Sequence, residues 1–205
     1  MLSRSVYRTM INHLFRHDGF LRNDKGAAAV EFAFVIPFMM LLYFSLVDIT
    51  GLISLNRRIV SAAATMADLV TQQTTTVLAS TIVDQFNAAY VTMQPMPSSN
   101  LRIEVYGYRY VGSTITLIWK TSNNQGPLCG AAPVTTNMAP MMTNGNDLIL
   151  ARTCTTYSPT IATFMGDNIL GATSFTVRQT ISARPRQGNL LTCYATTVAA
   201  GTLCS

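Results

Sequence analysis

The chain has 205 residues and a mass of 22.3 kDa, which is enough for one domain with an appendage. Charged residues make up 11% and hydrophobic residues 49% of the sequence, and the mean hydropathy is +0.28. Intrinsic disorder requires low hydrophobicity and high net charge, so this composition excludes a disordered chain. It also argues against a highly charged nucleic-acid binder, although the formal net charge is +5.

Residues 1–26 form a basic leader. Apolar side chains recur there at steps of four, which predicts an amphipathic basic helix suited to an anionic membrane surface; a largely disordered tail is the alternative. His13 and His17 fit one face of such a helix, but no third ligand accompanies them, so no metal site is predicted. Most of the net positive charge of the chain is in this leader, where Arg4, Arg8, Arg16, Arg22 and Lys25 outnumber two aspartates.

An uninterrupted apolar run occupies residues 27–47, with Glu31 as its only charge. As a helix it extends roughly 31 Å, about the thickness of the hydrocarbon core of a membrane, and a membrane helix tolerates Pro37. The run therefore predicts one transmembrane helix. A buried core helix is the alternative, and the run is too long for the apolar part of a signal peptide. The preceding basic cluster places the N-terminus in the cytoplasm and the rest of the chain outside.

Residues 48–95 are predicted to be an exported helical segment. The polar stretch 71–76 is expected to break or kink the helix before a second amphipathic part, which Pro95 and Pro97 end. Two apolar stripes at helical spacing support this prediction: Leu52, Ile59, Ala63, Met66 and Val70, and then Leu78, Ile82, Phe86 and Tyr90.

Residues 96–205 are predicted to be β-rich, with strands over 101–111, 115–119, 147–156 and 172–183 and a loop over 121–146. The Gly112-Ser113 pair predicts a hairpin. Packing a small antiparallel sheet on the exposed half of a long helix gives an α+β fold. Two sets of side chains alternate along the first two strands: Tyr106, Tyr108 and Tyr110, expected to form a packed sheet face or else a contact surface, and Ile115, Leu117 and Trp119, expected to share one face.

All four cysteines follow the apolar run, at positions 129, 154, 193 and 204. An even number on the exported side predicts two disulfides in an oxidising compartment. Three pairings are possible, and proximity in the sequence favours Cys129–Cys154 and Cys193–Cys204. A zinc site is the alternative, but the sequence has no C-x-x-C motif.

A carboxylate inside a membrane helix is costly and usually functional, which draws attention to Glu31. If the chain is cut between Gly26 and Ala27, the new α-amino group of Ala27 lies about one helical turn from Glu31. The cation and the anion can then compensate each other, within one subunit or between subunits. An interfacial glutamate in an ordinary membrane anchor is the alternative interpretation.

Gly26 is followed after four residues by Glu31 and then Phe32. This spacing resembles the cleavage pattern of type IV prepilins of the Flp/Tad (tight adherence) branch. With Pro37, the stretch from Lys25 to about residue 70 is similar to the start of TadE-like minor pseudopilins. Asp48 departs mildly from this resemblance, since the family more often has Glu there.

The resemblance implies a pilin-like fold and cleavage after Gly26 by a prepilin peptidase. Glu31, with Phe32, would align the subunit with its neighbours. The implied partners are the peptidase, other pilins or pseudopilins, the pilus assembly machinery and membrane lipid, without nucleic acid or cofactor. The implied location is the bacterial inner membrane, crossed once, with a periplasmic C-terminal domain. Incorporation into a surface pilus and a role at its base both remain open.

The sequence predicts no enzyme. It has no G-x-S-x-G, Walker loop or H-E-x-x-H motif. Both histidines precede the apolar run, so the exported portion has none for base catalysis. The main alternative to the pseudopilin hypothesis is a membrane-anchored exported binding domain that is never processed at Gly26.

Overall fold

A computed structural model describes residues 24–74, 76–133, 138, 140, 142–161, 174–186 and 192–194. The predicted N-terminal amphipathic helix, with its two histidines, and Cys204 lie outside the described residues. The chain divides into two compact units, Met1–Val47 and Asp48–Ser205.

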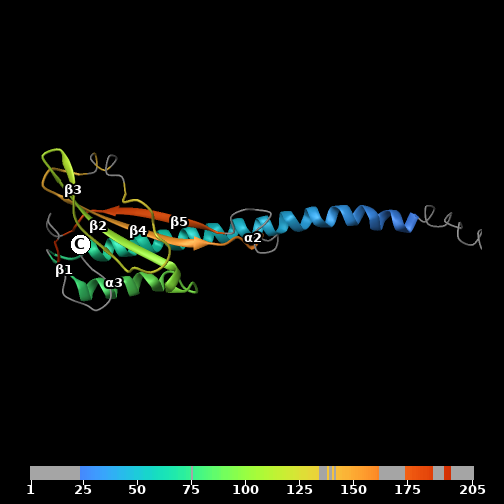
Figure 1. Ribbon diagram of the computed structural model, residues 1–205, viewed down its shortest axis with the longest axis horizontal. Helices are drawn as coiled ribbons and strands as arrows, with labels where there is room; N and C mark the ends of the chain where they lie inside the picture. Colours follow the sequence, from blue (N-terminus) through green and yellow to red (C-terminus); the bar gives the residue numbers. More distant parts are fainter. Residues whose placement is uncertain are drawn as a thin grey trace, which may run out of the picture. The chain divides into compact units, whose positions relative to one another are not determined.

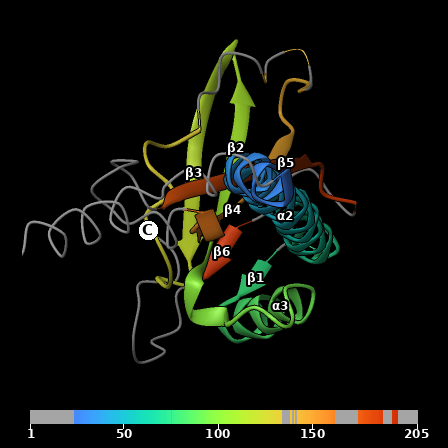
Figure 2. The same ribbon diagram turned by 90° about the vertical axis from the view of Figure 1, so that its right-hand side faces the viewer.

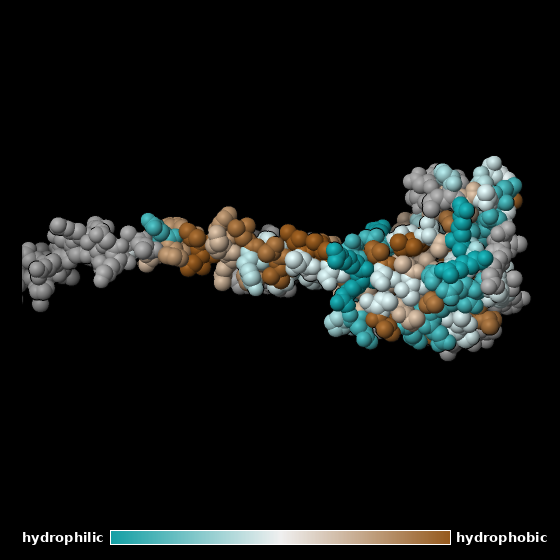
Figure 3. Space-filling view, turned by 180° about the vertical axis from the view of Figure 1, so that it is seen from behind, coloured by the Kyte–Doolittle hydropathy of each residue, from teal (hydrophilic) through white to brown (hydrophobic). Residues whose placement is uncertain are grey.

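Helix α2 runs from Asp24 to Thr71 without interruption, with Pro37 inside it. Within the first unit its large apolar side chains are exposed on every side, and Figure 3 shows them as a mostly hydrophobic surface. The helical residues Ala29–Thr71 are long and apolar enough to cross a membrane. Their most apolar stretch of 18 residues has a mean hydropathy of 2.1, and none of it is buried.

Within the second unit, the later turns of α2 are amphipathic and cover one face of a sheet (Figure 1). The predicted break occurs directly after Thr71, and the second helix, α3, is Ala79–Val91. Side chains from both helices meet the sheet in one core. The largest fully buried side chains that residues 48–95 contribute to it are Ile59, Met66, Val70, Val77, Ile82 and Met93.

The sheet has four antiparallel strands in the order β3-β2-β4-β5. This arrangement confirms the predicted α+β class, because a long apolar helix and a small antiparallel sheet make up the described fold. The short helical turn η2, Ser98–Asn100, leads into the sheet. Its strands are β2 (Leu101–Val111), β3 (Thr114–Ser122), β4 (Asp147–Tyr157) and β5 (Phe175–Ala183).

The β2–β3 hairpin turns at Gly112 and Ser113, as predicted. Both residues have positive φ, at 56° and 71°, which is the conformation that a two-residue hairpin turn requires to match the twist of its strands. The predicted strand 115–119 is longer than expected, and the loop expected over 121–146 begins only after Ser122.

The prediction that Ile115, Leu117 and Trp119 share one face is wrong. Trp119 pairs with Gly107 while Leu117 pairs with Tyr108, so Ile118 is an extra residue in β3. Such a β-bulge shifts the alternation of side chains by one position. Trp119 consequently belongs to the core under the helices, whereas Ile115 packs on the opposite face of the sheet.

The absence of a side chain at Gly107 leaves room in that core for the indole ring of Trp119. A Cβ atom at Gly107 would lie 2.4 Å from the Trp119 ring, far inside van der Waals contact. Trp119, the only tryptophan of the chain, is 3% exposed.

The opposite face of the sheet holds a second apolar cluster. Tyr106 and Tyr108 stack there at 6.1 Å between ring centroids, and Tyr110 packs against the cluster. Residues from the connection before β4 cover it, namely Met138 and Met142. The tyrosine row is therefore a packed sheet face, the first of the two interpretations.

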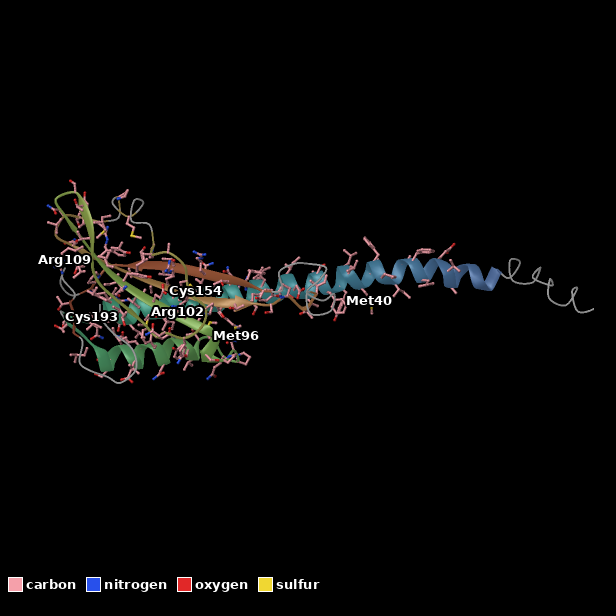
Figure 4. The ribbon with its side chains drawn as sticks, viewed as in Figure 1. Met40, Met96, Arg102, Arg109, Cys154 and Cys193 are labelled. Carbon is pink, nitrogen blue, oxygen red and sulfur yellow. A yellow bond between two sulfur atoms is a disulfide. The ribbon has the colours of Figure 1, made fainter. Side chains whose placement is uncertain are left out.

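A second, two-stranded parallel sheet was not predicted. It joins β1 (Thr76–Leu78), directly before α3, to β6 (Thr192–Tyr194), as Figure 2 shows beside α3. Strands of three residues are too short to give a sequence pattern. Cys193, labelled in Figure 4, packs from β6 against the main core.

Candidate functional site

The predicted processing and alignment residues, Gly26, Ala27, Glu31 and Phe32, all lie on α2 within residues 26–47, called the assembly segment below. Gly26 is inside the helix, and a Cβ atom there would meet nothing within 4 Å. Glu31 and Phe32 are exposed on the following turns, Phe32 to 66%. The side chain of Ala27 lies outside the described residues. Among the described residues, none forms a hydrogen bond or ion pair with Glu31, so its carboxylate is accessible to a partner.

The remainder of this segment presents an apolar surface all round the helix. Phe34 is 80% exposed and Tyr43 64% exposed. A helix that is hydrophobic on all sides requires a nonpolar environment or apolar partners. The described part of the first unit supplies neither.

Asp48, the first residue of the second unit, makes a polar contact that sequence analysis missed. Its two carboxylate oxygens accept the backbone N–H groups of Thr160, at 2.6 Å, and Ile161, at 3.0 Å. Its backbone carbonyl accepts the hydroxyl of Tyr157 at 2.8 Å. This contact, called the Asp48 clamp below, fastens the end of β4 to α2.

Gly51 lies one turn further along α2, next to the same tyrosine. A Cβ atom at Gly51 would approach the Tyr157 hydroxyl to 3.1 Å, which is tighter than ordinary contact. The glycine thus lets the Tyr157 hydroxyl come close to the helix backbone. The only sequence signal for the clamp was the position of Asp48 at the end of the apolar run, because its partners are more than a hundred residues away.

A buried ion network crosses β2 and β4. The carboxylate of Glu104 accepts Arg152 Nη2 at 2.7 Å and Arg152 Nε at 3.1 Å, Tyr106 Oη at 2.8 Å and Arg102 Nε at 2.8 Å. The Arg152 side chain is only 4% exposed. Its remaining hydrogen bonds go to the backbone carbonyls of Gly130 and Ala131.

Burial and hydrogen bonding act in opposite directions on Glu104. Burial raises the pKa of a carboxyl group, but the bonds from Arg152, Tyr106 and Arg102 stabilise the anion, and the net pKa of Glu104 is lowered. Burial and the neighbouring Glu104 raise the pKa of Tyr106 to about 12. The network therefore contains one carboxylate, two guanidinium groups and a neutral phenol at physiological pH.

A disulfide joins Cys129 to Cys154 on β4, the pairing that proximity favours. It fixes the chain beside Gly130 and Ala131, whose carbonyls accept the Arg152 bonds. Cys193 is also disulfide-bonded. The disulfide and the ion network thus support each other on the same face of the sheet.

A further ion pair links β2 to β4 near the hairpin. Arg109 on β2 donates from two nitrogens to the carboxylate of Asp147 on β4, at 2.7 and 2.9 Å. The hydrogen bond to this carboxylate raises the pKa of Arg109. Arg186 pairs with Asp68 of α2 at the surface. The first pair links two strands, and the second links α2 to the segment after β5.

The described residues contain no group of three or more His, Cys, Asp or Glu side chains that could hold a metal.

Together these features define a small α+β module with its own core, continuous with one helix that could span a membrane. Residues 26–68 match the family model described as TadE-like protein. This match supports a component associated with Flp/Tad pili. It begins at Gly26, ends within α2 and does not include the sheet. No curated protein and no solved structure matches the chain.

Proposed function

We propose that this chain is a TadE-like minor pseudopilin, a structural component in the assembly of a Flp-type pilus involved in tight adherence. The observation that carries the proposal is the coincidence of the TadE-like match at residues 26–68 with a helix that, apart from Glu31, exposes a mostly apolar surface before Asp48. Such a surface suits a subunit that moves from lipid into a helix-packed assembly, since both environments are apolar.

In this proposal a prepilin peptidase cuts after Gly26 on the cytoplasmic side of the inner membrane. The free carboxylate of Glu31 then pairs with the new α-amino group of Ala27 or of a neighbouring subunit. The module from Asp48 onward lies in the periplasm and contacts other pilins or pseudopilins. The role is structural, without catalysis by the chain itself.

The mature N-terminus tests the processing step. The full chain is expressed with the cognate prepilin peptidase or with a catalytically inactive form, and its N-terminus is read by mass spectrometry. We expect a chain that begins at Ala27 only with the active enzyme. A Gly26→Val variant should stay uncut although its fold is undisturbed, because nothing surrounds the position of its Cβ.

A full-length product in cells that make the complete pilus system would contradict processing. That result would favour the alternative function, a membrane-anchored binding domain that keeps its leader.

Glu31→Gln tests the alignment role, because it removes the charge and keeps the shape of the side chain. We expect the variant to be inserted and cut normally but to give few or no pili, counted by electron microscopy. Glu31→Asp keeps the charge and should retain part of the piliation. Normal piliation in Glu31→Gln would exclude the proposed pairing.

A further inference from the structure

A polar depression of about 240 Å³ opens over β2 and β3, on the sheet face opposite the helices. Its volume is below the roughly 300–1,000 Å³ of pockets that enclose whole small molecules, so it suits one side chain or another small group. The residues that line it are Arg102, Glu104, Tyr106, Lys120, Thr121, Ser122 and Asn124.

The charges in and beneath this depression do not balance. Arg102, Lys120 and Arg152 are three cations, against the single carboxylate of Glu104, which leaves two positive charges in excess. The carboxylate of Glu104 already accepts four hydrogen bonds, from Arg152, Tyr106 and Arg102. The depression therefore favours an anion.

Two of these cations, Arg102 and Lys120, have hydrogen-bond donors that no described residue accepts. Arg102, labelled in Figure 4, gives only its Nε to Glu104, and in the described part of the chain its two terminal nitrogens make no hydrogen bond. The ion pair with Glu104, at 2.8 Å, holds the guanidinium in place, and the Arg102 side chain is 15% exposed. Lys120 is exposed and, among the residues that the structure describes, has no partner either. A guanidinium fork beside an ammonium group matches the two oxygens of a carboxylate.

The surroundings favour a protein as the source of that carboxylate. Leu117 and Ile118, on the same strand as Lys120, are 44% and 39% exposed. The strand β3 is also an edge of the sheet, where another chain can approach. Exposed apolar side chains on the strand that carries Lys120, together with the positive charge, are complementary to an acidic side chain flanked by apolar residues.

We propose that this depression is a docking site for a Glu or Asp side chain of a partner protein, held by Arg102 and Lys120. The site lies outside the assembly segment and uses none of its residues. It can therefore exist whether or not Gly26 is cut.

The test uses the full, unprocessed chain in a neutral detergent, observed by NMR of its backbone amides. The probe is the capped peptide acetyl-Leu-Glu-Leu-Glu-amide, with acetyl-Leu-Gln-Leu-Gln-amide as the neutral control. We expect saturable shifts of the Lys120, Ser122 and Asn124 amides, with at least tenfold weaker binding of the neutral peptide. Lys120→Glu should weaken binding of the acidic peptide at least tenfold. Arg57→Glu makes the same charge change at an exposed site on α2 and should leave binding unchanged.

Arg102→Gln is a second variant that should lose binding, provided that its Trp119 fluorescence shows an intact fold.

Equal binding of the acidic peptide to Lys120→Glu and to the unaltered chain would overturn the proposal, as would an absence of shifts. Inorganic phosphate that binds as tightly as the peptide would show a general anion site instead. Tighter binding of dihexanoyl phosphatidylglycerol would identify a lipid headgroup site. Either result would also overturn the proposal.

Discussion

The two parts of helix α2 have the same secondary structure and opposite surroundings. Before Asp48 its large apolar side chains are exposed, with Phe34 at 80%, whereas further on Ile59 and Met66 are completely buried. Both parts belong to one continuous helix, Asp24–Thr71, so secondary structure does not distinguish them. The difference lies in what covers the side chains.

This comparison shows that one continuous helix can serve two kinds of packing. The later part is stabilised by contacts within its own unit, as most helices in folded domains are. The earlier part carries apolar area that the described chain leaves uncovered. Mutations in the two parts should therefore have different consequences for the unfolding of the second unit.

The largest effect is expected for Glu104→Leu, which leaves Arg152 buried without its anionic partner. Breaking one side of a buried ion pair typically costs about 3–5 kcal/mol. Urea unfolding of the full chain in neutral detergent, followed by Trp119 fluorescence, measures the change. Lys120→Gln on the exposed surface is the control and should change the stability by less than about 0.5 kcal/mol. An equal loss in both variants would mean that the network adds nothing specific.

The same carboxylate predicts a dependence on pH. Because the pKa of Glu104 is lowered from its ordinary value of 4.5 in the folded state, its contribution is fully present above about pH 4.5. It is lost as the pH falls through the lower, folded value, when the unfolded state has already bound the proton. We expect the unfolding midpoint to decrease below pH 4.5, and to do so less in Glu104→Gln. Parallel pH profiles for both proteins would contradict this assignment.

Met66→Ala and Met40→Ala compare the two parts of the helix directly, with the same chemical change. Met66 is completely buried, so its truncation should cost about 2–5 kcal/mol. Met40, labelled in Figure 4, is 53% exposed in the first unit, and its truncation should leave the Trp119 unfolding transition within about 0.5 kcal/mol. If Met40→Ala destabilises the second unit as much as Met66→Ala, the proposed division of roles is wrong.

The smallest effect is expected for the Asp48 clamp. Asp48→Asn keeps one acceptor but loses the charge that strengthens both hydrogen bonds, at a cost of about 1 kcal/mol. Asp84→Asn removes an exposed charge on α3 and is the matched control. The two variants should differ in urea midpoint, and the amides of Thr160 and Ile161 should exchange faster only in Asp48→Asn. Unchanged exchange at these amides would show that the clamp does not hold the segment.

Periodicity in the sequence was sufficient for much of this fold. The stripes through Ile59 and Met66 and through Ile82 and Phe86 predict the buried helix faces, and the Gly112-Ser113 pair predicts the hairpin. These features are local. In a regular helix, spacing along the chain determines which side chains share a face, and the turn residues are adjacent in the sequence. The apolar run and the position of Glu31 are also visible without a structure.

Other features depend on contacts between distant residues. The partners Glu104 and Arg152 lie 48 positions apart, and the only sequence signal was the presence of charged residues inside both strands. The bulge at Ile118 follows from the pairing of β3 with β2, which simple alternation does not reveal. The Asp48 clamp joins residues more than a hundred positions apart, so no short window of sequence contains both.

The contact between Gly107 and Trp119 links the evolutionary history of two positions. Any side chain at 107 would occupy the volume of the indole ring, so Gly107 cannot be replaced alone. Loss of the indole alone would leave a void beneath the helices. Related sequences should accordingly change these two positions together, with a larger residue at 107 accompanied by a smaller one at 119. A lineage in which both have changed would show that the core was rebuilt in paired steps.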